Sequence, residues 1–200
     1  VLVSTGHATH FRYGYIAWQP GTGANEVDFT VVNVFRRNGF TGSHTDGFLA
    51  VGDTILESVG NSKLYFGDGA QSNVLEYTIT AIDPAANWAS GEAKVSHTYV
   101  CNSLACTYEA FVTSCCRIQR CEAPNAHLNA SSRSGGPYRI ETLVNVGSGN
   151  SSPVSSLPPI VQCAAGGVCQ FTIPVSDNDG DPIRFRLSNN SESGIIRQPG

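Results

Sequence analysis

The spacing of apolar residues most constrains this 200-residue chain, because they alternate with polar residues at a period of two. Successive side chains of a strand point to opposite faces, so this alternation predicts strands with one buried face. In residues 26–36 the positions expected to face inward are Val27, Phe29, Val31 and Phe35. Later segments repeat the pattern at 75–81, 138–146, 169–175 and 183–187. No window of ten residues carries a helical stripe, and the sequence therefore predicts an all-β protein.

Residues 149–159 separate the alternating segments into two groups. This stretch is rich in Ser and Pro and has no apolar face, which is typical of a linker. About eight predicted strands precede it and suffice for a two-sheet sandwich, assigned to residues 1–148. Only about four short strands follow, in residues 160–200. We therefore expect tandem immunoglobulin-like β-sandwiches, with the second one incomplete: it is either truncated or completed by strands from elsewhere.

Composition excludes several classes of protein. Charged residues make up 14% of the chain, against roughly 25% in soluble domains, and hydrophobic residues make up 40%, which predicts an ordered chain. The net charge is −4 and the twelve basic residues are scattered, which argues against nucleic-acid binding. No apolar run approaches the ~18 residues that cross a bilayer, so no membrane contact is expected within this segment. Since the chain lacks Met and begins at Val1, we expect a processed or partial piece of a longer protein.

Four of the seven cysteines form two pairs with short separations. Cys101 and Cys106 flank one short loop, and Cys163 and Cys169 flank another. Each pair is close enough in sequence to close a tight loop or to join adjacent strands. Local disulfides are therefore the expected pairing.

The remaining cysteines, Cys115, Cys116 and Cys121, form a third cluster. Zinc is the alternative ligand, but this cluster has no His at a ligand-like spacing, which favours disulfides. Neighbouring side chains in a strand point in opposite directions, so Cys121 is expected to join only one of the adjacent pair. The odd cysteine is then free or bonded to another chain.

Sequons for N-linked glycosylation occur at Asn129, Asn150 and Asn189, all in polar stretches suited to surface loops. Together with the paired cysteines, they predict an extracellular glycoprotein, secreted or at the cell surface, with covalently attached glycans.

Two short blocks resemble the signature of polycystic-kidney-disease (PKD) domains, which are extracellular immunoglobulin-like modules. The first is Tyr-Phe-Gly-Asp-Gly at 65–69, and the second is Val-Ser-His-Thr-Tyr at 95–99, followed by a strand at 108–112. The flanking segments 10–18 and 114–118 resemble repeats in large surface or matrix proteins of protists, algae and some bacteria. The chain departs from the PKD pattern through a longer segment between the blocks and a Cys-bounded loop after them.

The PKD resemblance also implies roles for residues of the two blocks. Gly67 and Gly69 are expected to adopt positive φ in a hairpin turn, and Asp68 is expected to accept amides of that turn. His97 and Tyr99 would lie on the strand that enters the next corner.

The second half resembles the beginning of cadherin-like, dystroglycan-type repeats, on the segments 158–161, 171–175, 177–181 and 183–187. An acidic turn in it contains Asp177, Asp179 and Asp181, whose carboxylates suit a hard cation such as calcium. The alternative, which we favour, is a β-turn whose Asp and Asn side chains cap their own backbone. No other cofactor is expected.

The sequence carries no catalytic signature. It has no Gly-x-Ser-x-Gly elbow, no zinc-protease spacing among its His residues, and no carboxylate pair that could be nominated without arbitrary choice. Trp18, Trp88 and the Tyr residues could form a sugar-stacking platform, but core positions are the favoured interpretation. Arg36 and Arg37 are expected to end a strand on a solvated face.

These observations favour a non-catalytic structural glycoprotein that assembles with copies of itself into a filament, surface layer or adhesive stalk. The principal alternative is a calcium-dependent adhesin module that binds carbohydrate or protein. A third reading is a non-catalytic accessory fragment of a secreted hydrolase.

Overall fold

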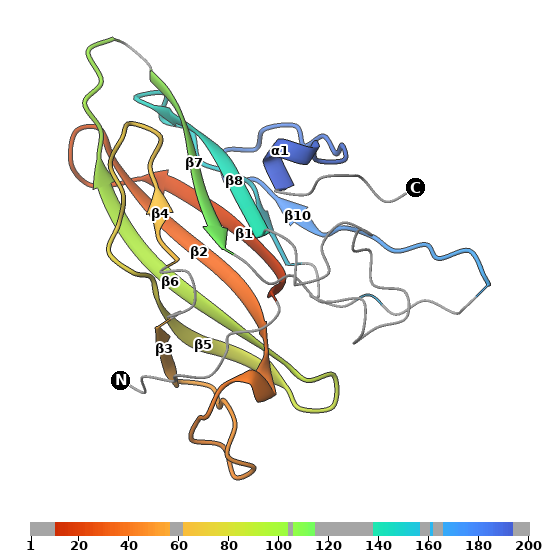
Figure 1. The fold of residues 1–200 in the computed structure, drawn as a ribbon. Coiled ribbons are helices and arrows are strands. Elements are labelled where there is room, and N and C mark those ends of the chain that lie inside the picture. Colours follow the sequence, from red (N-terminus) through yellow and green to blue (C-terminus); the bar gives the residue numbers. More distant parts are fainter. Residues whose placement is uncertain are drawn as a thin grey trace.

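The computed structural model describes residues 11–56, 62–103, 106–114, 138–156, 161 and 166–193. Within them, two antiparallel sheets face each other across a common core, as Figure 1 shows. The first sheet has five strands in the order β1-β2-β6-β5-β3, and the second has three in the order β4-β7-β8. The strands are β1 (Phe11–Pro20), β2 (Glu26–Arg36), β3 (Thr54–Leu56), β4 (Leu64–Tyr65), β5 (Glu76–Asp83), β6 (Trp88–Thr98), β7 (Cys106–Ser114), β8 (Tyr138–Val146), β9 (Val154–Ser155) and β10 (Val175–Ser176). A 3-10 turn, η1 (Arg37–Gly39), and a four-residue helix, α1 (Asn190–Ser193), complete the described elements, and the predicted all-β sandwich is confirmed.

Strand β2 is an inner strand of the first sheet, paired along its length with β1 on one side and β6 on the other. It is rich in Val and Phe, whose branched or aromatic side chains suit a pleated, half-buried surface. The inward row predicted from the alternation is confirmed, because Val27, Phe29, Val31 and Phe35 are all at most 3% exposed.

The core lies between the two sheets and is rich in aromatic rings. Phe11 stacks on Tyr138 of the opposite sheet, with ring centroids 4.2 Å apart. Phe35 meets Tyr77 edge to face, at 5.2 Å. Such arrangements are the ones that ring quadrupoles favour, so the packing fixes the spacing between the sheets.

One polar side chain interrupts the inward row of β2. Asn33 is fully buried, donates from Nδ2 to the Tyr77 hydroxyl and accepts from the Tyr138 hydroxyl, both at 2.7 Å. Tyr138 belongs to the second sheet, so this network joins the two layers. A Cβ on Gly14 would lie 2.1 Å from the Tyr138 hydroxyl oxygen, and only glycine leaves room for this contact.

The chain after β8 differs from the expected linker and second set of strands. Ser151 and Ser152 are only 7% exposed and lie against β1, so this part of the predicted linker is packed. Within the described residues, strand structure after β8 is confined to the short pair β9–β10. The strands expected over 169–175 and 183–187 are therefore wrong except at Val175, because these residues have no ladder partner beyond β9. The proposed division at 149–159 and the completion of a second sandwich stay predictions.

Candidate ligand-binding groove

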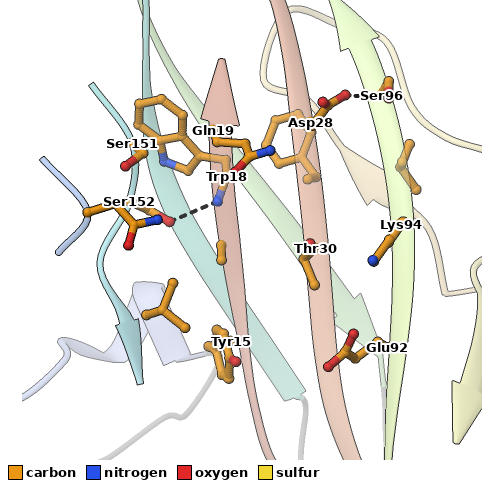
Figure 2. Close-up of a pocket in the computed structure, with 15 residues that line it drawn as sticks. Tyr15, Trp18, Gln19, Asp28, Thr30, Glu92, Lys94, Ser96, Ser151 and Ser152 are labelled. Atoms are coloured by element: carbon orange, nitrogen blue, oxygen red, sulfur yellow. Dashed lines mark hydrogen bonds between the residues drawn. The ribbon is translucent and has the colours of Figure 1, made fainter. Parts of the chain in front are cut away.

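A groove of about 600 Å³ lies on the outward face of the first sheet, over β1, β2 and β6 (Figure 2). The sheet supplies most of its lining, and the C-terminal part of the chain supplies the rest. The lining residues are Tyr15, Ala17, Trp18, Gln19, Asp28, Phe29, Thr30, Glu92, Lys94, Val95, Ser96, Ser151, Ser152, Val154 and Asn178.

The floor of the groove consists of cross-strand rows, in which one residue each from β1, β2 and β6 lie opposite one another. Gln19 lies opposite Asp28, which lies opposite Ser96, and the Ser96 hydroxyl donates to Asp28 at 2.6 Å. In the next row, Ala17 pairs with Thr30. These two side chains are small, so the sheet is hollow between larger neighbours.

Strand β6 completes the row of Ala17 and Thr30 with Lys94, which lies opposite Thr30. Further along, Tyr15 and Glu92 lie on either side of Val32. Burial raises the pKa of Tyr15, and nearby Tyr13 and Glu92 add to the shift, so its phenol stays protonated at neutral pH.

One wall of the groove is built beyond the edge strand β1. Ser152 donates its backbone N–H to the Trp18 carbonyl at 2.9 Å, and its hydroxyl accepts the Trp18 N–H at 2.8 Å. Ser151 donates both its N–H and its hydroxyl to Asp179, at 2.7 and 2.6 Å. The wall is therefore tied to β1 on one side and to the acidic turn on the other.

The Trp18 side chain lies beside Ser151 and Ser152, as Figure 2 shows. It is 5% exposed and belongs to the core, which confirms for this residue the interpretation favoured from the sequence. Its indole Nε1 is buried and has no hydrogen-bond partner within the described part of the chain.

A second polar cluster joins the two blocks that resemble a PKD signature. Asp68, in the turn after β4, contacts His97 of β6, with 2.7 Å between Oδ2 and Nε2. The His97 ring stacks on Phe66 at 3.9 Å, and the Tyr99 hydroxyl donates to the Phe66 carbonyl. Asp68 also accepts the Ala70 amide, and Gly67 and Gly69 have φ of +86° and +95°, as expected for this turn.

The electrostatics of Asp68 follow from these contacts. Partial burial acts to raise its pKa, but the hydrogen bonds from His97 and the Ala70 amide outweigh burial and lower it. Asp68 is therefore a carboxylate at neutral pH, held at the end of the sandwich. The geometry gives it a structural role, because its partners, the Ala70 amide and His97, belong to the turn and to β6.

Comparison with known protein families shows to which family the chain belongs. The model of the N-terminal domain of integrin beta-like proteins A–E matches residues 12–147. The chain belongs to this family. Integrin beta-like protein A of Dictyostelium discoideum is 33% identical over 94% of the chain, and protein C of the same organism is 32% identical over 90%.

The chain spans only about a tenth of the length of these integrin beta-like relatives. No solved structure matches it. The family shown is the integrin beta-like one, and the comparisons indicate no catalytic family; neither a PKD nor a cadherin-like family is shown. The PKD-like blocks lie within the matched residues, whereas the cadherin-like segments, between residues 158 and 187, all lie after them.

The cysteines of this integrin beta-like chain are described in part. Cys101 and Cys106 form the predicted disulfide, with a Cα–Cα distance of 5.8 Å. Cys169 is also disulfide-bonded, to a cysteine outside the described residues. The others, Cys115, Cys116, Cys121 and Cys163, lie outside the described residues, and their pairing stays a prediction.

The three predicted glycosylation sites differ in whether the structure describes them and in how exposed they are. Asn129 lies outside the described residues. Asn150 is half-buried and directly precedes the groove wall, while Asn189 is exposed beside α1. Glycans at these positions stay predictions.

The acidic turn is capped by its own side chain. Asp177 accepts the backbone amides of Asp179 and Asp181 at 2.9 and 3.1 Å, which is the backbone-capping arrangement weighed from the sequence. No group of three or more His, Cys, Asp or Glu able to hold a metal occurs among the described residues. Calcium binding here stays a prediction. The described residues also contain no helix long and apolar enough to span a membrane.

Sequence reasoning missed the role of Arg37. Instead of facing solvent, it is 2% exposed, makes a bidentate pair with Asp46 at 2.7 Å and donates from Nε to the Leu49 carbonyl. The hydrogen bonds from Arg37 hold the pKa of Asp46 far below its usual range. The expectation of a solvated face is wrong for Arg37 because the chain after η1 folds back over it.

Proposed function

We propose that the chain is a non-catalytic, extracellular adhesion module of a cell-surface protein, and that the groove over β1, β2 and β6 is its ligand-binding surface. Membership of the integrin beta-like family supports an adhesion-type role at the cell surface. The observation that carries the assignment is the groove itself. Its exposed polar side chains project from a rigid sheet, which is where binding residues are held most firmly.

The groove is suited to recognition rather than to catalysis. Its carboxylates, Asp28 and Glu92, come from different strands, and the Asp28 carboxylate is engaged by Ser96. Lys94 is exposed and lies between them on the same face. Such a surface offers several hydrogen-bond donors and acceptors at fixed spacing, with no activated nucleophile.

The experiment is an attachment assay with beads coated with the chain. Wild-type beads are expected to adhere to cells or to the cells' natural substrates, and Thr30→Tyr, which fills the hollow floor, should abolish adhesion. Thr113→Tyr is the matched control, because Thr113 is an exposed residue of β7 in the second sheet and does not line the groove. Absence of wild-type adhesion, or equal adhesion by both variants, would contradict the assignment.

A second candidate is a self-assembling structural subunit, as favoured from the sequence. The observation that supports it is a set of exposed apolar side chains in the C-terminal segment, at Phe171, Phe185 and Leu187. Exposed apolar rows of this kind mark interaction surfaces. Copies of the chain would then associate through residues 166–193, and sedimentation of the full chain against one ending at Asn150 tests this: only the full chain should oligomerise.

A further inference from the structure

We propose that the groove recognises an oligosaccharide that is neutral or weakly charged. This inference rests on the proposed function and names the ligand class of the same site. It follows from the arrangement of polar groups, the charge, the shape of the floor and the state of the neighbouring sheet edge.

The polar groups of the groove are of the types that pair with sugar hydroxyls. Gln19, Asp28 and Ser96 form a continuous row across three strands, with amide, carboxylate and hydroxyl groups in sequence. Neighbouring strands are ~4.8 Å apart, so adjacent members of the row can hydrogen-bond to neighbouring hydroxyls of one ring. A carboxylate accepts hydrogen bonds from such hydroxyls, whereas an amide both accepts and donates, so the row gives orientation as well as affinity.

The charges of the groove disfavour the other common ligands. The lining contains two carboxylates, Asp28 and Glu92, and one cation, Lys94. Polyanions such as sulfated chains or nucleic acids require an excess of cations, and strongly basic peptides require an excess of carboxylates. A nearly balanced lining suits a ligand without strong net charge.

The shape of the floor fits a flat ring with an apolar face. Ala17 and Thr30 leave a hollow at the centre, and the half-exposed ring of Tyr15 lies at one end of it. An aromatic ring packs against the C–H face of a sugar while its hydroxyl remains available for hydrogen bonding. Because the Tyr15 phenol is protonated at neutral pH, it can act as a donor.

The edge of β1 argues against an added peptide strand, the main alternative. Strand addition needs unpaired backbone groups at a sheet edge. At the groove, both the N–H and the carbonyl of Trp18 are already bonded to Ser152. A ligand must therefore bind to side chains on the face of the sheet rather than extend the ladder.

The test measures binding of the purified chain to a panel of labelled oligosaccharides ending in mannose, galactose or N-acetylglucosamine, with heparin as the polyanion. We expect wild-type binding to at least one neutral member. Asp28→Asn keeps the size of the side chain and an acceptor for Ser96, and should weaken binding about tenfold or more, since bonds to charged groups are the strong ones. Thr30→Tyr should abolish binding, and Thr113→Tyr, on the second sheet, should bind as wild type.

Three results would overturn the inference: no binding to any neutral oligosaccharide, preference for heparin, or equal binding by all variants. The bead assay separates this failure from that of the proposed function. If beads adhere, yet removal of glycans from the target surface and competition by free sugars leave adhesion unchanged, the ligand is a protein and only the sugar assignment is lost. If beads coated with wild-type chain do not adhere at all, the adhesion function itself is wrong.

Discussion

At the scale of single residues, the contact between Asn33 and two tyrosines shows how a polar group can stabilise a sandwich core. Asn33 bridges Tyr77 and Tyr138, which come from opposite sheets. A buried polar group that keeps its hydrogen-bond partners favours one packing arrangement. Removing a partner leaves a buried donor or acceptor without a hydrogen bond, which destabilises the fold.

Replacing Asn33 by Ala is expected to lower the free energy of unfolding by about 2–4 kcal/mol, because two buried hydrogen bonds are lost. Tyr138→Phe removes only one of them and should lower it by about 1–2 kcal/mol. Urea denaturation followed by tryptophan fluorescence measures both. The control is Asn73→Ala, at an exposed position in the turn before β5, which should change stability by less than about 0.5 kcal/mol. An Asn33→Ala variant as stable as this control would show that the network does not contribute.

The Asp68–His97 contact makes stability depend on pH in the acid range. The folded-state pKa of Asp68 is lowered, so its contribution is complete above the ordinary carboxyl value and disappears as the pH falls through the folded-state pKa. Asp68→Ala should therefore destabilise the chain by about 1–2 kcal/mol at pH 7, and this difference should shrink towards zero as the pH falls through the lowered folded-state pKa of Asp68. Denaturation curves of both proteins from pH 7 to pH 2 provide the measurement; a difference that grows on acidification would contradict the assignment.

At the scale of elements, the Cys101–Cys106 bridge closes the short connection between β6 and β7, strands that belong to different sheets. Tyr108 reinforces this connection by donating its hydroxyl to the Val100 carbonyl at 2.9 Å. The bridge thus acts on a single turn between layers rather than on the chain as a whole.

Replacing both Cys101 and Cys106 by Ser should lower the free energy of unfolding by about 2 kcal/mol, because a loop of this length restricts the unfolded chain only modestly. The variant should still fold, since the core and both sheets are retained. Thermal denaturation of variant and wild type without reductant measures the effect. Complete loss of the cooperative transition would show that the bridge is required for folding, contrary to this expectation.

At the scale of the whole molecule, the sandwich is closed along one edge by Ser151 and Ser152, which lie beyond the residues matched by the family model. The core of the described residues is formed by residues 11–146. We therefore regard the sandwich as the folding unit and the segment from Ser151 as an addition that shapes the groove.

A chain ending at Asn150 should fold cooperatively but lose about 1–3 kcal/mol, because the Trp18 N–H and carbonyl lose their partners. It should also lose the groove wall and with it the binding measured on oligosaccharides. Circular dichroism, urea denaturation and the binding panel test these points together. A non-cooperative unfolding curve would mean that residues after Asn150 belong to the core of the sandwich.

Much of the fold could be predicted from the sequence because a strand has a fixed period. Alternation correctly predicted the buried face of β2, and the two glycines of the turn after β4 correctly predicted its positive φ angles. The same rule failed over 183–187, where alternating apolar residues are present but no described strand pairs with them. Alternation states which side of a strand would be buried, and pairing depends on a partner elsewhere in the chain.

The sequence by itself determined the strands up to Val146, the chemistry of the turn after β4 and the Cys101–Cys106 disulfide, because each depends on residues close together in the chain. Only the tertiary structure decided that Asn33 and Arg37 are buried, and that Asp68 meets His97. Their partners lie in other elements, and local spacing carries no information about such contacts. The groove belongs to the same class, since it exists only where three strands and residues 151–154 meet, and none of these segments carries a binding motif of its own.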